Sequence, residues 1–571
     1  MMLREKLDSI RRPLHNALCS ALMLGIAAAW ATPALATSAK VTAPDGTFEG
    51  KFDTTGAMRE FLGIRYAQPV TGNLRWKAPQ PVTPSIATQD ATQFGNHCPQ
   101  VPSPFGNGTS TEDCLFLNVY TPNRIGDRDS QGDDDGPLPV MLWIHGGALV
   151  VGESDDYNAS KLVSRGVIVV TINYRLGALG FLAESALSGE SPDHISGNYG
   201  IEDQQEALKW VRRNIRAFGG DPQRVTVFGE SAGGLSTFTN LVSPTAAGLF
   251  HRAIVESGAY MQTFPTLAQA QTAGANFASA VGCTQSTPAA VLACLRALPV
   301  ATILANQAAI FPPGTLGPAP NVDGKVLPQS IGPALASGQF NRVPLIDGTN
   351  HSEWNLFVAI DFDLTPGVGP VTSATYIPAI QATLGVNAIA ATGIAALYPV
   401  PLAFPTFDQG VGGLGTDAIF ACAAHFADEL ASPFVPTFAY EFNDPNPPQN
   451  FLPPVSFPYG ASHASEIQYV FPEANPSGVG LNLAQVPLDA NQQKLSDQMV
   501  DYWTQFAKFG DPNGLGHPFW PRFHRDTQVM QSLVPPTPAP EANFAIVHQC
   551  TFWDAASGRT LPAVPNLSAA N

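Results

Sequence analysis

Ser231 lies between two glycines in the segment Gly229-Glu230-Ser231-Ala232-Gly233. This segment directly follows the apolar run 225–228, whose composition is typical of a buried strand. A Gly-x-Ser-x-Gly turn from a strand into a helix is so sharp that only glycine fits on either side of the serine. The turn leaves the serine hydroxyl exposed at the N-terminus of the helix, where developing negative charge is favoured. The segment therefore predicts a nucleophilic serine.

Acyl transfer by a serine also needs hydrogen-bond donors for the oxyanion that forms on the attacked carbonyl. His145-Gly146-Gly147-Ala148 follows the apolar segment 141–144 and fits a loop that lends backbone N–H groups to an oxyanion hole. Small residues are needed there because the substrate carbonyl must approach the main chain closely. An ordinary tight turn is the alternative interpretation. The N–H of Ala232, at the start of the helix, is expected to be a further donor.

A serine nucleophile requires a base to accept its proton and an acid to orient that base. In the chain order Ser, Asp or Glu, His, the acid and the base each follow a later strand. Glu353 lies just beyond a strand candidate at 342–347, and its rival Asp347 closes that segment. We favour Glu353, because a residue that closes the strand is more readily structural. His463 lies in a loop after a second strand candidate, 437–442, and is the expected base.

The elements that would hold these side chains alternate along the N-terminal half of the chain. Residues 203–218 carry apolar side chains at helical intervals. Continuous apolar strands separated by amphipathic helices predict an α/β fold with a large, mostly parallel central sheet and helices on both faces. Ala-rich stretches at 259–339 and 366–430 are expected to be helical insertions that cover this sheet. Three continuous apolar segments are strand candidates: 139–144, 167–173 and 225–228.

Residues 1–36 have the organisation of a secretory signal peptide. A basic start precedes an apolar stretch from Ala17 to Ala31, and Ala34-Leu35-Ala36 is an Ala-x-Ala cleavage site. An uncleaved membrane anchor is the alternative, although this stretch is short for a bilayer span. No later stretch is long and apolar enough to cross a membrane. We therefore expect one catalytic domain over residues 37–571, secreted or periplasmic.

The net charge and the cysteines agree with export. The formal net charge is −17, and loss of the leader, with its four basic and two acidic residues, makes it −19. Such a charge repels phosphate backbones, so we expect no nucleic-acid partner. Six cysteines remain after cleavage, which suggests three disulfides, although six cysteines allow fifteen pairings. No Cys-x-x-Cys or His-x-x-x-His spacing indicates a metal, and the acidic run 127–136 lacks the ligand spacing of a calcium loop.

Several motifs together resemble the type-B carboxylesterase/lipase family, whose members have the α/β-hydrolase fold. The resemblance implies Ser231 as nucleophile, Glu353 as the orienting acid and His463 as general base and then general acid. It also implies hydrolysis of small-molecule esters without a metal or another cofactor. The oxyanion hole that it implies is built from four residues: donors at Gly147, Ala148 and Ala232, with Gly146 shaping the loop. Besides the two glycine-containing segments, the matching blocks spread along the chain: 63–69, 112–119, 173–182 and 218–222.

Two departures from the family pattern bear on the substrate. Ala148-Leu149 occupies the place where many relatives have a third glycine and an aromatic, so the acyl side of the pocket should differ in shape. The loop from Cys98 to Cys114 has neither a tryptophan nor a long amphipathic lid, which disfavours choline esters and strong interfacial activation. Ser257 falls where the family keeps a serine near the acid. The resemblance also implies three disulfides: Cys98–Cys114, Cys283–Cys294 and Cys422–Cys550.

The expected function is that of a secreted serine carboxylic ester hydrolase acting on soluble small-molecule esters. A lipase and a polyester or carbamate hydrolase are alternatives that use the same chemistry. A non-catalytic binding protein on the same scaffold, like the neuroligins, is a further alternative, but here all three triad positions hold competent residues. We expect Trp354 and Leu149 in the pocket wall. The sequence leaves the natural ester and the oligomeric state open.

Overall fold

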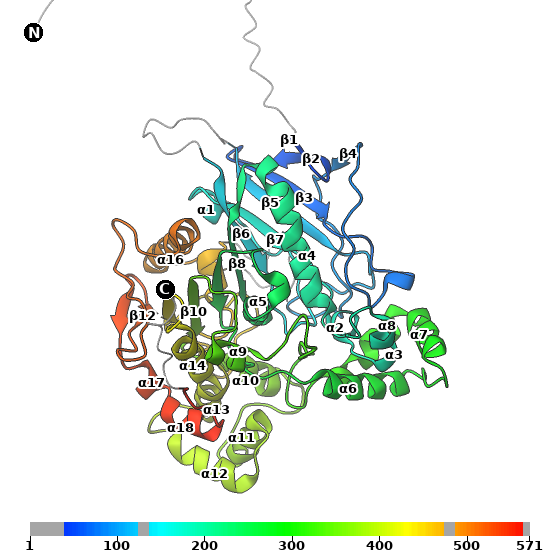
Figure 1. The fold of residues 1–571 in the computed structure, drawn as a ribbon. Coiled ribbons are helices and arrows are strands. Elements are labelled where there is room, and N and C mark those ends of the chain that lie inside the picture. The colour runs from blue at the N-terminus through cyan, green and yellow to red at the C-terminus, as the bar shows by residue number, and fades with distance from the viewer. Residues whose placement is uncertain (1–38, 124–135, 473–485, 563–571) are drawn as a thin grey trace, which may run out of the picture. The chain divides into compact units, whose positions relative to one another are not determined.

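The structure is a computed structural model that describes residues 39–123, 136–472 and 486–562. The predicted signal peptide lies outside the described residues, as does nearly all of the acidic run at 127–136. Within these residues, a sheet of thirteen strands forms the frame of the molecule, and helices cover both of its faces (Figure 1).

The sheet is parallel in its centre and antiparallel at its two margins. The strand order is β1-β2-β3-β5-β7-β6-β8-β9-β10-β11-β12-β13, with β4 beside β2. Every neighbouring pair from β7 to β12 is parallel, whereas β1 to β5 and the final β13 pair antiparallel along this order. The strands are β1 (Ala39–Ala43), β2 (Gly46–Phe52), β3 (Met58–Arg65), β4 (Thr88–Asp90), β5 (Phe116–Pro122), β6 (Leu138–Ile144), β7 (Ile168–Ile172), β8 (Gly220–Glu230), β9 (Arg252–Glu256), β10 (Leu345–Asn350), β11 (Thr437–Phe442), β12 (Met530–Leu533) and β13 (Ala539–Glu541).

The helices fall into those that flank the sheet and those of the insertions. The predicted helix at 203–218 is observed as α4 followed by a short 3-10 turn, and the predicted insertions are helical. The α-helices are α1 (Ser160–Val163), α2 (Gly177–Phe181), α3 (Ser185–Glu190), α4 (Tyr199–Asn214), α5 (Ala232–Leu241), α6 (Leu267–Ala280), α7 (Pro288–Ala297), α8 (Val300–Asn306), α9 (Ile331–Ser337), α10 (Asn355–Val358), α11 (Tyr376–Leu384), α12 (Ala388–Leu397), α13 (Phe407–Gly415), α14 (Cys422–Ala431), α15 (Ile467–Val470), α16 (Ala490–Phe509), α17 (Phe544–Val547) and α18 (Cys550–Ala556).

The strand predictions for the catalytic frame are confirmed, with one shift. The segments 139–144, 167–173, 225–228 and 437–442 coincide with β6, β7, part of β8 and β11. The strand predicted at 342–347 begins later, at Leu345, and continues to Asn350. Its last three residues pair with Tyr440–Phe442 of β11, so Gly348-Thr349-Asn350 is strand although its composition is typical of a loop.

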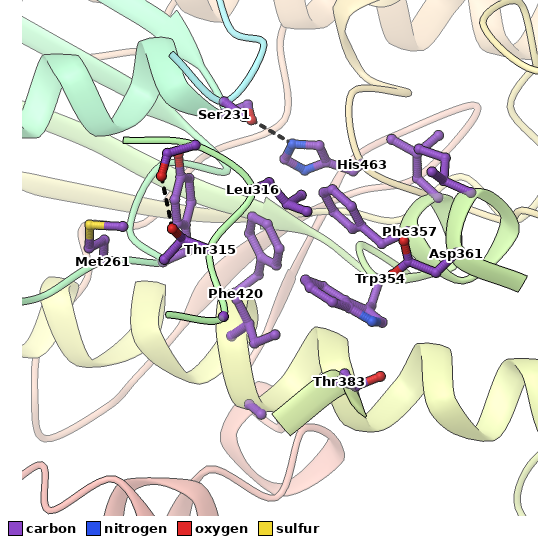
Figure 2. A pocket seen from close by; sticks show the side chains of 18 of the residues that line it. Ser231, Met261, Thr315, Leu316, Trp354, Phe357, Asp361, Thr383, Phe420 and His463 are labelled. Carbon is purple, nitrogen blue, oxygen red and sulfur yellow. Dashed lines mark hydrogen bonds between the residues drawn. The ribbon is translucent and has the colours of Figure 1, made fainter. Parts of the chain in front are cut away.

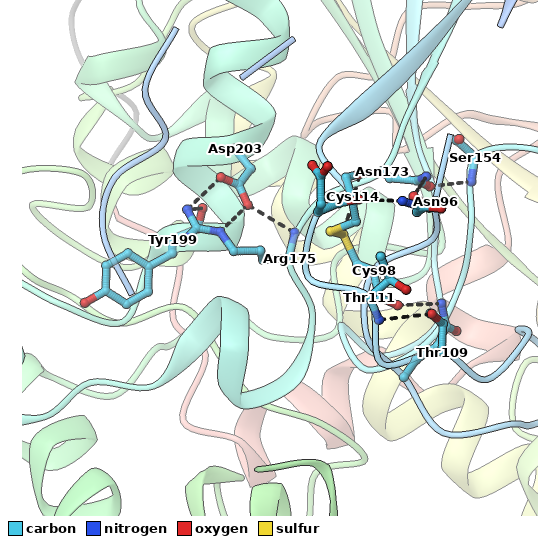
Figure 3. Close-up of a disulfide and its surroundings, with 12 residues drawn as sticks. Asn96, Cys98, Thr109, Thr111, Cys114, Ser154, Asn173, Arg175, Tyr199 and Asp203 are labelled. Atoms are coloured by element: carbon cyan, nitrogen blue, oxygen red, sulfur yellow. Dashed lines mark hydrogen bonds and ion pairs between the residues drawn. A yellow bond between two sulfur atoms is a disulfide. The ribbon is translucent and has the colours of Figure 1, made fainter. Parts of the chain in front are cut away.

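The structure contains all three disulfides that the family resemblance implied. Cys98–Cys114 closes a loop beside Asn173, whose side chain donates to the backbone carbonyl of Asn96 (Figure 3). The pair Cys422–Cys550 links α14 to α18 across a sequence separation of 128 residues. In the described part of the chain, we find no single helix with the length and hydropathy of a bilayer span.

Candidate active site

Ser231 lies at the sharp turn between β8 and α5. Its backbone has φ 55° and ψ −121°, a conformation that non-glycine residues seldom adopt. The two flanking glycines are required by close packing against β6. A Cβ atom on Gly233 would lie 1.9 Å from the carbonyl oxygen of Ile144, and one on Gly229 would lie 2.5 Å from that same oxygen. The turn therefore keeps its position only while both residues lack a side chain.

The structure brings Ser231, His463 and Glu353 into one hydrogen-bonded chain. Oγ of Ser231 lies 2.7 Å from Nε2 of His463 (Figure 2). On the other side of the ring, Nδ1 of His463 lies 2.6 Å from Oε2 of Glu353. With its proton on Nδ1, the imidazole donates to the carboxylate and accepts from the serine hydroxyl. Glu353 is fully buried and His463 nearly so, whereas Ser231 is half-buried at the cavity surface.

The carboxylate of Glu353 is held by three further donors to its second oxygen. The hydroxyl of Ser257 donates over 2.5 Å and that of Thr349 over 2.7 Å, and the backbone N–H of Asn350 donates over 2.7 Å. The rival acid Asp347 lies within β10, and among the described residues neither of its carboxylate oxygens has a hydrogen-bond partner. The geometry therefore pairs the histidine with Glu353, as the sequence order predicted.

Two carboxylates raise the pKa of the His463 imidazole. Burial alone would lower the pKa of this imidazole, but the negative charges of Glu230 and Glu353 outweigh burial and raise the pKa to about 9. Oε1 of Glu230 lies 3.2 Å from Nε2 of His463. Burial in turn raises the pKa of Glu230 well above its usual range. The site therefore stabilises a proton at the histidine, which is the form that follows proton abstraction from a serine.

The loop 146–148 borders the same cavity as Ser231. Among the described residues, the backbone N–H groups of Gly147 and Ala148 donate no hydrogen bond within the chain. Ala232 is the first residue of α5, where an N–H has no partner inside the helix. A Cβ atom on Gly146 would lie 2.8 Å from Oε2 of Glu230 and 3.2 Å from Cβ of Ser231, so this glycine permits the loop to approach the serine.

The cavity at Ser231 has a volume of about 1490 Å³. Phe357 and Phe420 stand beside the imidazole of His463, and Trp354 lies against these two rings (Figure 2). The rings of Phe420 and Phe357 lie 4.9 Å and 5.2 Å from the imidazole, measured between centroids. Trp354 and Leu149, which the sequence suggested for the pocket wall, both line the cavity. No Lys or Arg occurs among its described lining residues.

A second histidine network supports one wall of this cavity. Asp417 belongs to the π-helical turn η6 (Thr416–Ala421), which also carries Phe420. Nδ1 of His548 lies 2.6 Å from Oδ1 of Asp417, and its Nε2 lies 2.7 Å from Oε1 of Glu441. Nδ1 of His351 lies 2.7 Å from that same oxygen. His351, Glu441 and His548 lie close enough to hold an ion, but the network pairs both ring nitrogens of His548 without one.

Sequence reasoning missed this network and the contact of Glu230 with His463. The hydrogen-bonded pairs of the network are 90, 107 and 131 residues apart in the chain, so no local spacing marks them. Glu230 was visible only as the variable residue of the Gly-x-Ser-x-Gly turn. A signal did exist for Glu230, because a residue adjacent to the nucleophile at a sharp turn must lie close to the reacting groups.

A family model described as the carboxylesterase family matches residues 37–553. The para-nitrobenzyl esterase of Bacillus subtilis (strain 168) is 35% identical over 504 residues, which cover 86% of this chain and 93% of the relative. The cocaine esterase of Homo sapiens is 32% identical over 529 residues, 87% of each chain. Among solved structures, a thermophilic PNB esterase aligns with a TM-score of 0.72 at 32% identity, covering 90% of this chain and 99% of that one.

These matches extend over nearly the whole described chain, and they agree with the parallel centre of the sheet and with the position of Ser231 after β8. The chain therefore belongs to the type-B carboxylesterase family, with its α/β-hydrolase fold, and is a carboxylic ester hydrolase.

Proposed function

We propose that this protein hydrolyses small-molecule esters through an acyl-enzyme on Ser231. The observation that carries the proposal is the continuous chain of short contacts from Ser231 through His463 to Glu353 at the wall of a large cavity. A hydroxyl is a weak nucleophile at its ordinary pKa, so it needs a base within hydrogen-bond reach. His463 is that base, and Glu353 fixes the tautomer in which Nε2 is free to accept a proton.

In acylation, His463 takes the proton of Ser231 as Oγ attacks the carbonyl carbon of the ester. The carbonyl oxygen becomes an oxyanion, which accepts hydrogen bonds from the backbone N–H groups of Gly147, Ala148 and Ala232. Such donors each lower the barrier by about 3 kcal/mol, because they face the charge only as it develops. Glu353 and Glu230 stabilise the imidazolium that forms meanwhile.

Collapse of the tetrahedral intermediate breaks the bond to the leaving oxygen, which takes the proton from Nε2 of His463 and departs as the alcohol. Water then enters, gives a proton to His463, and attacks the acyl carbon. A second oxyanion forms in the same place. Its collapse releases the carboxylic acid and returns the proton to Ser231, so the enzyme is regenerated without a cofactor.

The walls of the cavity favour an uncharged ester with a bulky apolar group. Phe357 and Phe420 border the imidazole, and Trp354 packs against Phe357 in a tilted arrangement with ring centroids 4.5 Å apart. Asp156 and Asp361 also line the cavity, without a Lys or Arg among the described lining residues. An ester that carries its own carboxylate would therefore be repelled, whereas neutral substrates fit.

We also propose that the protein is exported and that its leader is cleaved before Thr37. Three disulfides support it, because such bonds persist in oxidising compartments. Mass spectrometry of protein recovered from the periplasm or the medium should find Thr37 at the N-terminus. Recovery of the protein with residues 1–36 attached would contradict this assignment.

The catalytic proposal is tested with a chain-length series of neutral p-nitrophenyl esters. The wild type should hydrolyse them, with a preference for acyl groups longer than acetyl because of the apolar walls. Ser231→Ala should lower kcat by about 10⁴-fold or more without changing the folded fraction. Wild-type turnover in Ser231→Ala would overturn the assignment of the nucleophile. A wild type that hydrolyses no ester of the series would refute the proposed function.

A further inference from the structure

One long segment at the cavity carries no side chain that is charged at neutral pH. Residues 364–407 contain no Asp, Glu, Lys, Arg or His, although the chain as a whole has a net charge of −17. The segment builds α11, α12 and the first residue of α13. A surface helix normally places charged residues on its outer face, because that face remains in water. In α12 the inner face packs through Ala391 and Ile394, and the outer face is exposed without a single charge.

Large apolar side chains are exposed on this segment. Ile389, on the outer face of α12, is 88% exposed, and Leu402, just beyond that helix, is 89% exposed. Neither side chain lines the cavity. Isolated exposed apolar residues are common on proteins, but a contiguous apolar surface without charges is typical of a binding surface.

The exposed segment is continuous with the mouth of the cavity. Leu316, Leu397 and Phe552 are each exposed, and each also lines the cavity. A hydrogen bond joins the end of α12 to the start of α18, since Nε2 of Gln549, the residue before α18, donates to the carbonyl of Leu397 over 3.3 Å. Figure 1 shows α11, α12 and α18 together at one end of the drawing. We call these five residues the apolar rim: Leu316, Ile389, Leu397, Leu402 and Phe552.

We propose that the apolar rim docks this esterase on the surface of a condensed phase of uncharged ester, from which substrate enters the cavity directly. The proposal rests on the proposed function and adds to it the physical state of the substrate. A neutral phase fits the rim because the rim has no charge, whereas the net charge of −17 repels an anionic membrane surface. A second copy of this chain seated on the rim would cover the mouth of the cavity, which hydrolysis requires to be open.

This docking needs no lid. The loop between Cys98 and Cys114 is short, and the apolar side chains of the rim are already exposed in the structure. The rate on an emulsion should therefore follow the amount of enzyme adsorbed. Adsorption is expected without a conformational opening, and in this respect the protein would differ from enzymes that expose their apolar surface only at an interface.

The double variant Ile389→Glu/Leu402→Glu tests the proposal with a tributyrin emulsion. Adsorption is measured by depletion of protein from the aqueous phase, using versions of each protein that also carry Ser231→Ala, so that this readout does not depend on turnover. The matched control is Ile86→Glu/Leu515→Glu, whose side chains are also fully exposed but lie outside the rim. We expect adsorption to fall at least tenfold in the rim variant and to stay at the wild-type level in the control.

Turnover provides the second readout. The rim variant should hydrolyse dissolved p-nitrophenyl acetate within twofold of the wild-type rate, while its rate on the emulsion falls in parallel with adsorption. Equal adsorption of the rim variant and the wild type would overturn the proposal. So would a wild-type dimer that the rim variant converts to monomers, because the rim would then be an interface between copies. If the wild type adsorbs but hydrolyses neither ester, the docking surface stands and the proposed function fails.

Discussion

Oγ of Ser231 and Nε2 of His463 lie 2.7 Å apart, although 232 residues separate them in the chain. The parallel sheet explains this meeting. Ser231 follows the carboxyl end of β8 and His463 follows that of β11, with β9 and β10 between them in the sheet. Loops at the carboxyl ends of parallel strands emerge at one edge, so side chains distant in sequence can converge there.

The raised pKa of His463 predicts how activity depends on pH. Only the neutral imidazole can accept the proton of Ser231, and the carboxylates of Glu353 and Glu230 raise the pKa of the imidazole to about 9. Activity should therefore be lost as the pH falls, with a midpoint above the usual histidine value of about 6.5. Removing one carboxylate by Glu230→Gln should move the midpoint of kcat/KM to lower pH.

The measurement is a pH profile of kcat/KM with p-nitrophenyl acetate for the wild type, Glu230→Gln and the control Glu49→Gln. Glu49 lies on β2, at the opposite margin of the sheet from β11. The control should follow the wild-type profile. A wild-type midpoint at or below 6.5, or an unchanged midpoint in Glu230→Gln, would contradict this account of the electrostatics.

Gly233 should tolerate no side chain. A Cβ atom there would lie 1.9 Å from the carbonyl oxygen of Ile144, so β6 and the turn at Ser231 would have to separate. We expect Gly233→Ala to lower the free energy of unfolding by about 1–3 kcal/mol and to reduce kcat at permissive temperature. The control Gly189→Ala lies in α3, where an added Cβ meets open space, and should be neutral or stabilising. Urea denaturation and turnover measure both effects, and a fully stable, fully active Gly233→Ala would refute this packing argument.

The network around His548 should stabilise the fold over a defined range of pH. Burial alone would lower the pKa of His548, but Asp417 and Glu441 raise it to about 10. Burial raises the pKa of Glu441, but His351 and His548 more than offset this and lower it to about 2. The histidine contributes stability that is complete below about pH 6.5 and is lost as the pH rises through 10. The carboxylate contributes stability that is complete above about pH 4.5 and is lost as the pH falls toward 2.

The variant His548→Gln should therefore be destabilised most between about pH 4.5 and 6.5, by about 3 kcal/mol, because buried carboxylates lose their cationic partner. The difference in Tm from the wild type should shrink above pH 9. The variant His524→Gln is the control, since that side chain is exposed and outside the network. A Tm difference that does not change between pH 6 and pH 10 would show that the histidine acts by packing alone.

Asp347 should destabilise the protein as the pH rises. Burial raises its pKa well above the usual range, and the nearby buried carboxyl of Asp428 has a pKa raised by burial and by the charge of Asp347. An acid whose pKa is higher in the folded state holds its proton there after the unfolded chain has lost it. Stability therefore falls as the pH rises from about 4 through the folded-state pKa.

The variant Asp347→Asn should remove part of this fall in stability with rising pH, so it should raise Tm at pH 8 more than at pH 4. Asp526→Asn, at an exposed position, provides the matched control. Calorimetric scans across this range measure the effect. A lower Tm for Asp347→Asn at every pH would contradict this prediction, because it would mean that the carboxylate is stabilised by a partner in the folded state.

The sequence predicted the turn at Ser231 and the central strands because the signals for them are local. Ser231 is marked by two glycines that the turn requires, and β6, β7 and β8 are marked by continuous apolar runs that burial on both faces explains. The order of acid and base along the chain then selected Glu353 and His463. Each of these inferences needed only neighbouring residues or chain order.

The features that escaped prediction depend on pairing between distant segments. Gly348-Thr349-Asn350 has the composition of a loop, yet it forms strand because β11 provides its hydrogen-bond partners. The antiparallel margin was not predicted: β1 and β2 alternate buried with less buried positions over five and seven residues, and β4 has only three residues. Phe420 lies beside His463 on the turn η6. Asp417 of this turn is hydrogen-bonded to His548, which lies more than a hundred residues further along the chain.

Covalent labelling with an organophosphate tests the role of Ser231 most directly. Intact mass and peptide mapping should find one adduct per wild-type chain, on Ser231. Ser231→Ala should remain unlabelled, and His463→Ala should react far more slowly because nothing accepts the serine proton. A single adduct on a different residue, together with unimpaired ester turnover by Ser231→Ala, would contradict the mechanism.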